Sequence, residues 1–188
     1  MKKTTQKTVL ILVTLFTFFI GCKKDEDPVP QPQPPSNEEE VITTMRLTFV
    51  DSSDHSNVIT ASFRDPDGDG GLAYDLFDTI RLEQNKTWET SILLLNETVV
   101  PADTISNEVL DEGDEHLFCY TPSGTSAAVI ITDMDSNGLP IGLQSKWYTG
   151  AAGNGTIQVE LRHQPGVKDG TCIPGDTDIS VVFEIEIQ

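Results

Sequence analysis

Two short acidic stretches carry side-chain oxygens at a spacing that a calcium ion can use. Both place an oxygen-bearing side chain at alternate positions and then a glycine. The residues are Asp65, Asp67 and Asp69 in DPDGDGG, and Asp133, Asp135 and Asn137 in DMDSNG. Ligands at loop positions 1, 3 and 5 with glycine at 6 match the first half of an EF-hand loop. Ca²⁺ is therefore the cofactor that these stretches predict.

The match ends after the first half of each loop. Position 12 should be a bidentate Glu, but it is Leu76 in the first stretch and Gln144 in the second. The flanking residues read as strands, so these are not EF-hands. A looser calcium loop, completed by Asp75 or Asp78, is one interpretation. The other is turn chemistry alone, because Asp-Gly and Asn-Gly favour tight turns.

The histidines offer a second kind of site. His116 follows the acidic run DEGDE, and His163 ends the strand-like stretch TIQVELRH. If these two strands are neighbours, both imidazoles and a carboxylate could bind Zn²⁺ or another transition metal. The alternative is that both are solvated loop residues, as we expect for His55.

Enzyme signatures are absent from the sequence. It contains no G-x-S-x-G, no H-E-x-x-H and no glycine-rich phosphate loop ahead of a helix. We therefore expect no enzymatic activity. Trp88, Trp147, Tyr120 and Tyr148 could form a platform for sugar stacking, although such residues more often fill a core.

The amino-terminal segment is typical of an exported protein. Lys2, Lys3 and Lys7 precede an apolar run that ends at Gly21 and is shorter than the roughly 20 residues of a membrane-spanning helix. The end of the run, Phe-Ile-Gly-Cys, resembles the lipobox of bacterial lipoproteins. The resemblance implies that residues 1–21 are a signal peptide and that Cys22 is acylated. The alternative is an ordinary signal peptide with an incidental cysteine.

A stalk follows the predicted lipidation site. Residues 22–40 contain KKDED and then PVPQPQPPSNEEE, whose prolines favour extended polyproline II over a packed element. KKDED resembles the surface-export signal of Bacteroidota lipoproteins, or it is a plain spacer. We expect an outer-membrane protein that is held by its lipid and exposed at the surface.

The charge of the chain limits its partners. Twelve basic and 30 acidic side chains give a formal net charge of −18. Such a charge repels nucleic acids and favours cations or basic partners. We expect no nucleic-acid partner, and membrane attachment through the lipid.

The remaining residues, 41–188, are predicted to form one β-sandwich domain. Apolar side chains alternate with polar ones in TTMRLTF, VITASF, TIQVELRH and ISVVFEIEI, and five more short stretches read as strands. Only DTISNEVLDE could form a short helix. The pattern predicts an all-β fold, an antiparallel sandwich that is immunoglobulin-like or related. A small barrel is the alternative.

Outside the cytoplasm Cys119 and Cys172 could form a disulfide.

From Asn37 onward the chain resembles a family of small Bacteroidota outer-membrane lipoproteins. The matching pieces are NEEEVITTMRLTF, DPDGDGG, LLNET, DEGDEHLFCYTPSG, DMDSNGLPIGL, TIQVELRHQPGVKDG and GDTDISVVFEI. Members often carry the label of a type 1 periplasmic-binding fold, which consists of two α/β lobes. The length of this chain and its lack of alternating helices favour the sandwich instead.

Two functions fit these observations. The first is a non-enzymatic binding module that assists an outer-membrane receptor in nutrient or metal uptake. The second is a structural or adhesive surface protein whose loops are stabilised by Ca²⁺.

Overall fold

The computed structural model describes residues 40–67 and 73–188. Every described residue belongs to one compact unit, Asn37–Gln188. The predicted signal peptide, the lipidation site Cys22 and the linker as far as residue 39 lie outside the described residues, as does Asp69.

The described part of this unit consists of short strands and one helix. In chain order they are β1 (Thr44–Asp51), β2 (Asp54–Arg64), β3 (Leu76–Phe77), β4 (Ile80–Leu82), β5 (Thr87–Leu95), α1 (Ile105–Asp111), β6 (His116–Ser123), β7 (Ala128–Ile131), β8 (Gln144–Tyr148), β9 (Gly153–His163) and β10 (Asp176–Ile187).

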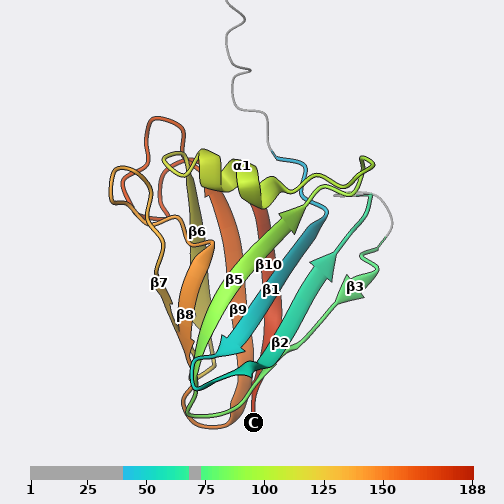
Figure 1. Cartoon of the computed structure of the whole chain (residues 1–188), viewed down its shortest axis with the longest axis vertical. Helices are drawn as coiled ribbons and strands as arrows, with labels where there is room; N and C mark the ends of the chain where they lie inside the picture. Colours follow the sequence, from blue (N-terminus) through green and yellow to red (C-terminus); the bar gives the residue numbers. More distant parts are fainter. Residues whose placement is uncertain (1–39, 68–72) are drawn as a thin grey trace, which may run out of the picture. The chain divides into compact units, whose positions relative to one another are not determined.

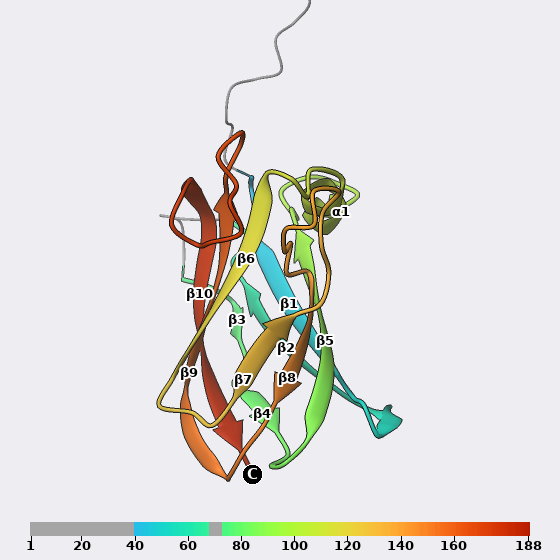
Figure 2. The same ribbon diagram turned by 90° about the vertical axis from the view of Figure 1, so that its left-hand side faces the viewer.

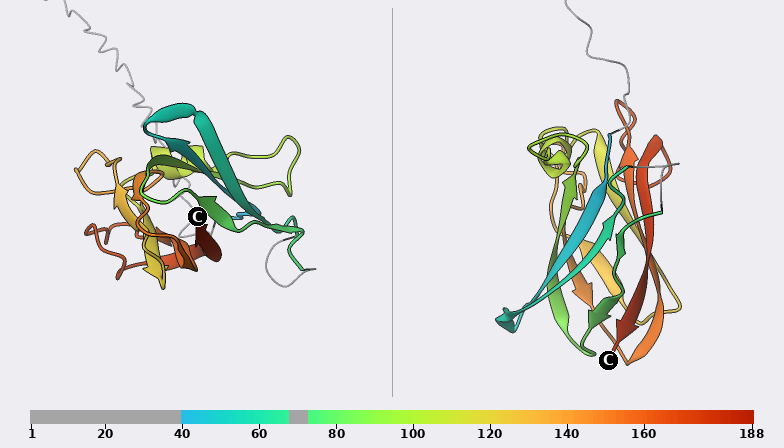
Figure 3. Two further views of the ribbon diagram at one scale, coloured as in Figure 1. Left: turned by 90° about the horizontal axis from the view of Figure 1, so that it is seen from below. Right: turned by 90° about the vertical axis from the view of Figure 1, so that its right-hand side faces the viewer.

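These strands form two facing sheets, which confirms the all-β sandwich (Figures 1 and 2). One sheet has the order β3-β2-β1-β5-β8-β7, and the other has the order β4-β10-β9-β6. The sequence predicted antiparallel pairing throughout, but β4 runs parallel to β10, with Ile80 opposite Ile185. The view along the strands in Figure 3 shows the two layers on either side of the interior.

The alternation in the sequence decides which face of each strand is buried. Met45, Leu47 and Phe49 of β1 are buried, as are Val181 and Phe183 of β10. Burying a large apolar side chain contributes about 1.5–3 kcal/mol. Other core residues include Trp88 and Trp147, which lie opposite each other on β5 and β8, together with Leu82, Leu94, Phe118, Ile157, Val159, Leu161, Ile185 and Ile187.

Helix α1 lies across one end of the sandwich, at the top of Figures 1 and 2. Ile105 and Val109 form its buried side. The backbone N–H of Leu94 donates to Ser106 Oγ at 2.5 Å, which fixes the helix to the end of β5. The first residues of β6 and β10 and the last residues of β9 lie at this same end (Figure 2).

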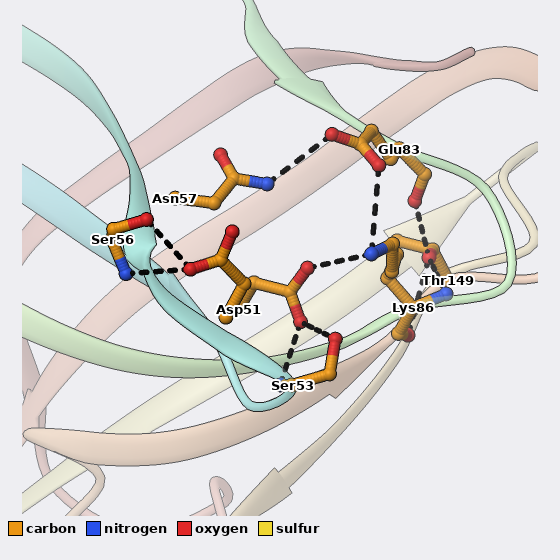
Figure 4. A network of polar contacts seen from close by, with 8 residues as sticks. Asp51, Ser53, Ser56, Asn57, Glu83, Lys86 and Thr149 are labelled. Atoms are coloured by element: carbon orange, nitrogen blue, oxygen red, sulfur yellow. Dashed lines mark hydrogen bonds and ion pairs between the residues drawn. The ribbon is translucent and has the colours of Figure 1, made fainter.

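A network of polar contacts joins the loops at the opposite end (Figure 4). Lys86 Nζ lies 2.7 Å from Asp51 Oδ2, and the Lys86 N–H donates to Thr149 Oγ1 at 2.9 Å. The hydroxyl of Thr149 in turn donates to the carbonyl of Glu83 at 2.6 Å. Ser53 donates to Asp51 Oδ1 from both its backbone and its hydroxyl. The network connects the ends of β1, β4 and β8.

We expect this network to make the fold sensitive to acid. The hydrogen bonds from Lys86 and Ser53 hold the pKa of Asp51 well below its ordinary value of 3.8. The ionised carboxylate therefore contributes stability above pH 4, and this contribution is lost as the pH falls through the folded-state pKa. Urea unfolding should show that Lys86→Met is more destabilising at pH 7 than at pH 2.5.

The matched control is Lys146→Met. Lys146 pairs with Glu89 at 3.8 Å, and both side chains are exposed, so its loss should change little at either pH. An equal loss at both pH values in Lys86→Met would contradict the role given to Asp51.

Candidate functional site

Two histidines face the interior at the end of the sandwich that α1 covers. His116 lies on the inner face of β6 because it alternates with the core residue Phe118, and His163 alternates in the same way with Leu161 of β9. The two histidines are direct cross-strand partners. Their rings are stacked, with centroids 4.7 Å apart and an interplanar angle of 4°. The contact on which the sequence hypothesis depended is therefore present.

A β-bulge brings a carboxylate to the same place. In the pairing of β10 with β9, Thr177 lies opposite Arg162 and Ile179 opposite Leu161, so Asp178 is an extra residue. A bulge changes the direction of the side chain at the extra residue. The side chain of Asp178 is 0% exposed, and its Oδ2 lies 3.8 Å from His116 Nε2.

The surroundings of His116 fix its protonation and its tautomer. Nδ1 lies 3.1 Å from the carbonyl oxygen of Glu112, which can only accept, so Nδ1 carries the hydrogen. Nε2 has no hydrogen-bond partner among the described residues, although the side chain is 0% exposed. Burial lowers the pKa of His116 to about 4, so the ring is neutral at pH 7. The lone pair of Nε2 is then available and faces Asp178.

His163 is the more accessible of the two rings. Its side chain is 10% exposed, and its Nε2 lies 3.6 Å from Glu115 Oε2, a carboxylate at the surface. Donor atoms of His116, His163 and Asp178 all lie within 4.8 Å of one another. We call these three residues the His–Asp cluster. Two imidazole nitrogens and a carboxylate oxygen at this spacing are a donor set that a single metal ion can share.

Further carboxyl groups surround the His–Asp cluster. Burial, the charges of Glu108 and Asp178, and a hydrogen bond with Glu108 together raise the pKa of Glu40 to about 7. Glu112 adds to the same negative field. Glu40 lies shortly before β1, while Glu108 and Glu112 come from α1 and the residue after it. Acidic side chains from separate segments therefore converge on one end of the sandwich.

The loop between β9 and β10 holds this end together. Gln164 N–H donates to the carbonyl of Glu115 at 2.6 Å, next to His116. Gly175 has a φ of +80°, and a Cβ there would lie only 2.0 Å from the carbonyl oxygen of His163. A disulfide joins Cys119 of β6 to Cys172 of the loop, with their Cα atoms 6.1 Å apart. The loop therefore fixes the spacing between the strands that carry the cluster.

In the second predicted calcium loop, the carboxylate of Asp133 accepts hydrogen bonds from the backbone. Its Oδ1 accepts the N–H of Gly142 at 2.9 Å, and its Oδ2 accepts the N–H of Gln144 at 3.1 Å. These bonds attach the loop to the start of β8, so turn chemistry of the kind expected as the alternative is present.

Asp135 is also engaged within the loop. Its Oδ1 accepts the backbone N–H groups of Asn137 and Leu139, and its Oδ2 lies 2.9 Å from Lys168 Nζ. Burial alone would raise the pKa of Asp135, but the hydrogen bonds from Lys168 and the backbone keep it below its ordinary value. An ammonium group thus already neutralises the carboxylate that was predicted to bind Ca²⁺. Calcium binding by Asp133, Asp135 and Asn137 stays a prediction.

The first predicted calcium loop is only partly described. Asp65 and Asp67 lie just after β2, and the Asp65 N–H donates to the carbonyl of Thr43 at 2.8 Å. Asp69 lies outside the described residues, and calcium binding by Asp65, Asp67 and Asp69 stays a prediction.

The aromatic residues that could have stacked on a sugar are separated by burial. Trp88 and Trp147 are fully buried in the core. The hydroxyl of Tyr120 donates to the carbonyl of Gly142 at 2.5 Å, and only Tyr148 of the four is exposed. These four residues therefore do not form one exposed platform.

Sequence reasoning named His116 and His163 but not the acid that joins them. Strict alternation along ISVVFEIEI, extended backwards, places Asp178 on the outer face, and only the bulge turns it inward. The one sequence signal was the Pro-Gly-Asp-Thr-Asp run ahead of the strand, which marks a turn without locating a bulge.

Comparison with family models, with curated proteins and with solved structures found no match for this chain. Within the part of the chain that the structure describes, no helix has the length and apolar character needed to cross a membrane.

We expect the disulfide to carry much of the stability of this end. Cys119 and Cys172 are separated by 53 residues, and closing a loop of that size contributes on the order of 4 kcal/mol in the chain-entropy model. Urea unfolding of Cys172→Ser should show a loss of about this size.

The reduced wild type serves as the control for this prediction. It should unfold at nearly the same urea concentration as Cys172→Ser, and Cys119→Ser/Cys172→Ser should be no less stable than either. A Cys172→Ser variant as stable as the oxidised wild type would contradict the role given to the disulfide.

Proposed function

We propose that this chain is a non-enzymatic binding module, anchored to the outer membrane by a lipid on Cys22, that captures a small ligand at the α1 end of its sandwich. The observation that carries the proposal is the His–Asp cluster. Two imidazoles and a carboxylate gather there, next to the apolar core.

Apolar side chains at these three positions would not carry the cost of burying polar atoms. The neighbouring inward positions of the same strands are Phe118, Leu161 and Ile179. Apolar residues in place of His116, His163 and Asp178 would extend the same core. Leaving a buried polar atom such as His116 Nε2 without a partner costs about 1–3 kcal/mol. A bound ligand that uses this atom offsets the cost, which supports a binding role for the cluster.

The amino-terminal residues support the location of the module. A lipidated Cys22 and a proline-rich stalk would hold the domain at a membrane surface, where it could pass its ligand to an outer-membrane receptor. Binding is proposed in preference to catalysis because the sequence contains none of the motifs of the common enzyme classes. The structural or adhesive protein stabilised by Ca²⁺ is less well supported, since Lys168 and backbone groups already use the carboxylates of Asp133 and Asp135.

The anchoring part of the proposal is tested at Cys22. We expect wild-type protein to be found in the outer-membrane fraction and its amino-terminal peptide to carry acyl chains on Cys22 by mass spectrometry. Cys22→Ala should lose both the acyl mass and the membrane association. A wild-type chain with an unmodified cysteine would remove the anchoring part of the proposal.

The binding part is tested on full-length protein extracted gently from its own membrane. Native mass spectrometry of the wild type should show a non-covalent adduct that denaturation removes. Asp178→Asn should lose the adduct, because that substitution removes the charge of the buried carboxylate. The same adduct on Asp178→Asn, or none on the wild type, would count against capture at this cluster.

The matched control is Glu184→Gln on the same strand. Glu184 is exposed and alternates with the buried Phe183 and Ile185, so it points away from the interior. This variant should keep the adduct of the wild type.

A further inference from the structure

We propose that the ligand of the His–Asp cluster is a single divalent transition-metal ion, held by His116 Nε2, an imidazole nitrogen of His163 and a carboxylate oxygen of Asp178. This inference rests on the proposed function, since it identifies the ligand of the same position. It concerns residues that are separate from the two aspartate loops that the sequence first suggested for Ca²⁺.

The donor atoms decide the class of ion. Ca²⁺ and Mg²⁺ require several oxygen ligands, whereas this cluster offers two imidazole nitrogens and one carboxylate. Imidazole suits zinc, copper, nickel and iron, and sites with two histidines and one carboxylate are established for zinc and non-haem iron. The cluster therefore fits a first-row transition metal and not a hard alkaline-earth ion.

His116 is already prepared as a ligand. Its Nδ1–H donates to the carbonyl of Glu112 at 3.1 Å, which leaves the lone pair on Nε2. Metal-bound histidines commonly donate their other N–H to a carbonyl or a carboxylate in this way, which holds the ring in place. The side chain is fully buried, and Nε2 has no partner among the described residues while it faces Asp178 at 3.8 Å. This is an independent sign of a ligand, beyond the acidity of the surroundings.

The charge around the cluster favours a cation. Asp178 lies within it, and the charges of Asp178, Glu108 and Glu112 all act on Glu40. Lys168 is the lysine whose charge reaches His116, but its ammonium group is already bound by Asp135 Oδ2 and the carbonyl of Gly113. A divalent ion at the cluster would offset negative charge that the nearby lysine does not.

Binding requires a defined movement of one ring. In a tetrahedral site with bonds of about 2.0–2.1 Å, ligand atoms lie about 3.3 Å apart, so the 3.8 Å between His116 Nε2 and Asp178 Oδ2 needs only a small closure. An ion also lies in the plane of each imidazole that binds it, but the two rings are stacked and parallel. His116 is held by Glu112, so His163 is the ring that must turn, which would change its 3.6 Å contact with Glu115.

The test measures Zn²⁺ binding to the full-length lipoprotein in detergent after treatment with a chelator. Competition against a chromophoric chelator should show one high-affinity ion per wild-type chain, and Ca²⁺ should not displace it. His116→Gln and Asp178→Asn should each weaken binding by about 100-fold or more, since even changes behind the ligands cost 10–100-fold. Two variants serve as controls: His55→Gln, at an exposed histidine of the β1–β2 hairpin, and Asp133→Asn, in the second aspartate loop. Both should bind Zn²⁺ with the affinity of the wild type.

A measurement on the wild type alone keeps the proposal testable if a variant does not fold. Long-range ¹H–¹⁵N spectra of the imidazoles should show that Zn²⁺ shifts Nε2 of His116 while Nδ1 keeps its hydrogen, and that a nitrogen of His163 shifts with it. Absence of a one-to-one Zn²⁺ complex, unchanged binding in His116→Gln, or unshifted His116 nitrogens would each overturn the proposal.

The outcome separates this inference from the proposed function. If the native adduct depends on Asp178 but is not a metal, and the chelated protein does not bind Zn²⁺, the binding module stands and the metal does not. If there is neither an adduct nor Zn²⁺ binding, both proposals fail.

Discussion

The register of β9 against its two neighbours determines what the α1 end of the sandwich contains. Because β9 pairs with both β6 and β10, it sets His163 directly opposite His116 on one side and next to the bulge at Asp178 on the other. Side chains alternate between the faces of a strand, so a shift of one residue would turn His163 to the outer surface and Arg162 into the core. The apolar residues Ile157, Val159 and Leu161 hold the register that places the polar cluster.

At the α1 end of the sandwich, ionisable side chains are buried directly beside the apolar core. Three adjacent strands change from apolar to ionisable side chains at one level, under a short helix whose own buried side is only Ile105 and Val109. The disulfide and the hydrogen bonds of the loop between β9 and β10 support this region from the outer face of β6. The opposite end is closed differently, by the compensated pair of Asp51 and Lys86. The buried Nε2 of His116 has no hydrogen-bond partner among the described residues and faces Asp178, which is a reason to place the function at the α1 end.

Much of the fold could be predicted from the sequence, because it depends on local alternation. The pattern in TTMRLTF gave the buried face of β1, and DTISNEVLDE gave the position of α1. The parallel pairing of β4 with β10 joins residues more than a hundred positions apart and leaves no local sign. The site divides in the same way. His116 and His163 were nameable from residue type, whereas Asp178 depends on a bulge, which is a property of two strands together. The loop around Asp133 and Asp135 shows that ligand spacing alone does not separate an ion site from a turn.

The position of β10 in its sheet has a consequence for how the protein is made. This strand, residues 176–187, lies between β4 and β9 and buries Phe183, Ile185 and Ile187 in the core. Until it emerges, β4 has no partner in its sheet, and the sandwich cannot close. Because β10 follows every other strand of the sandwich along the chain, the strands made before it cannot complete the core by themselves, and closure of the two sheets comes late in folding.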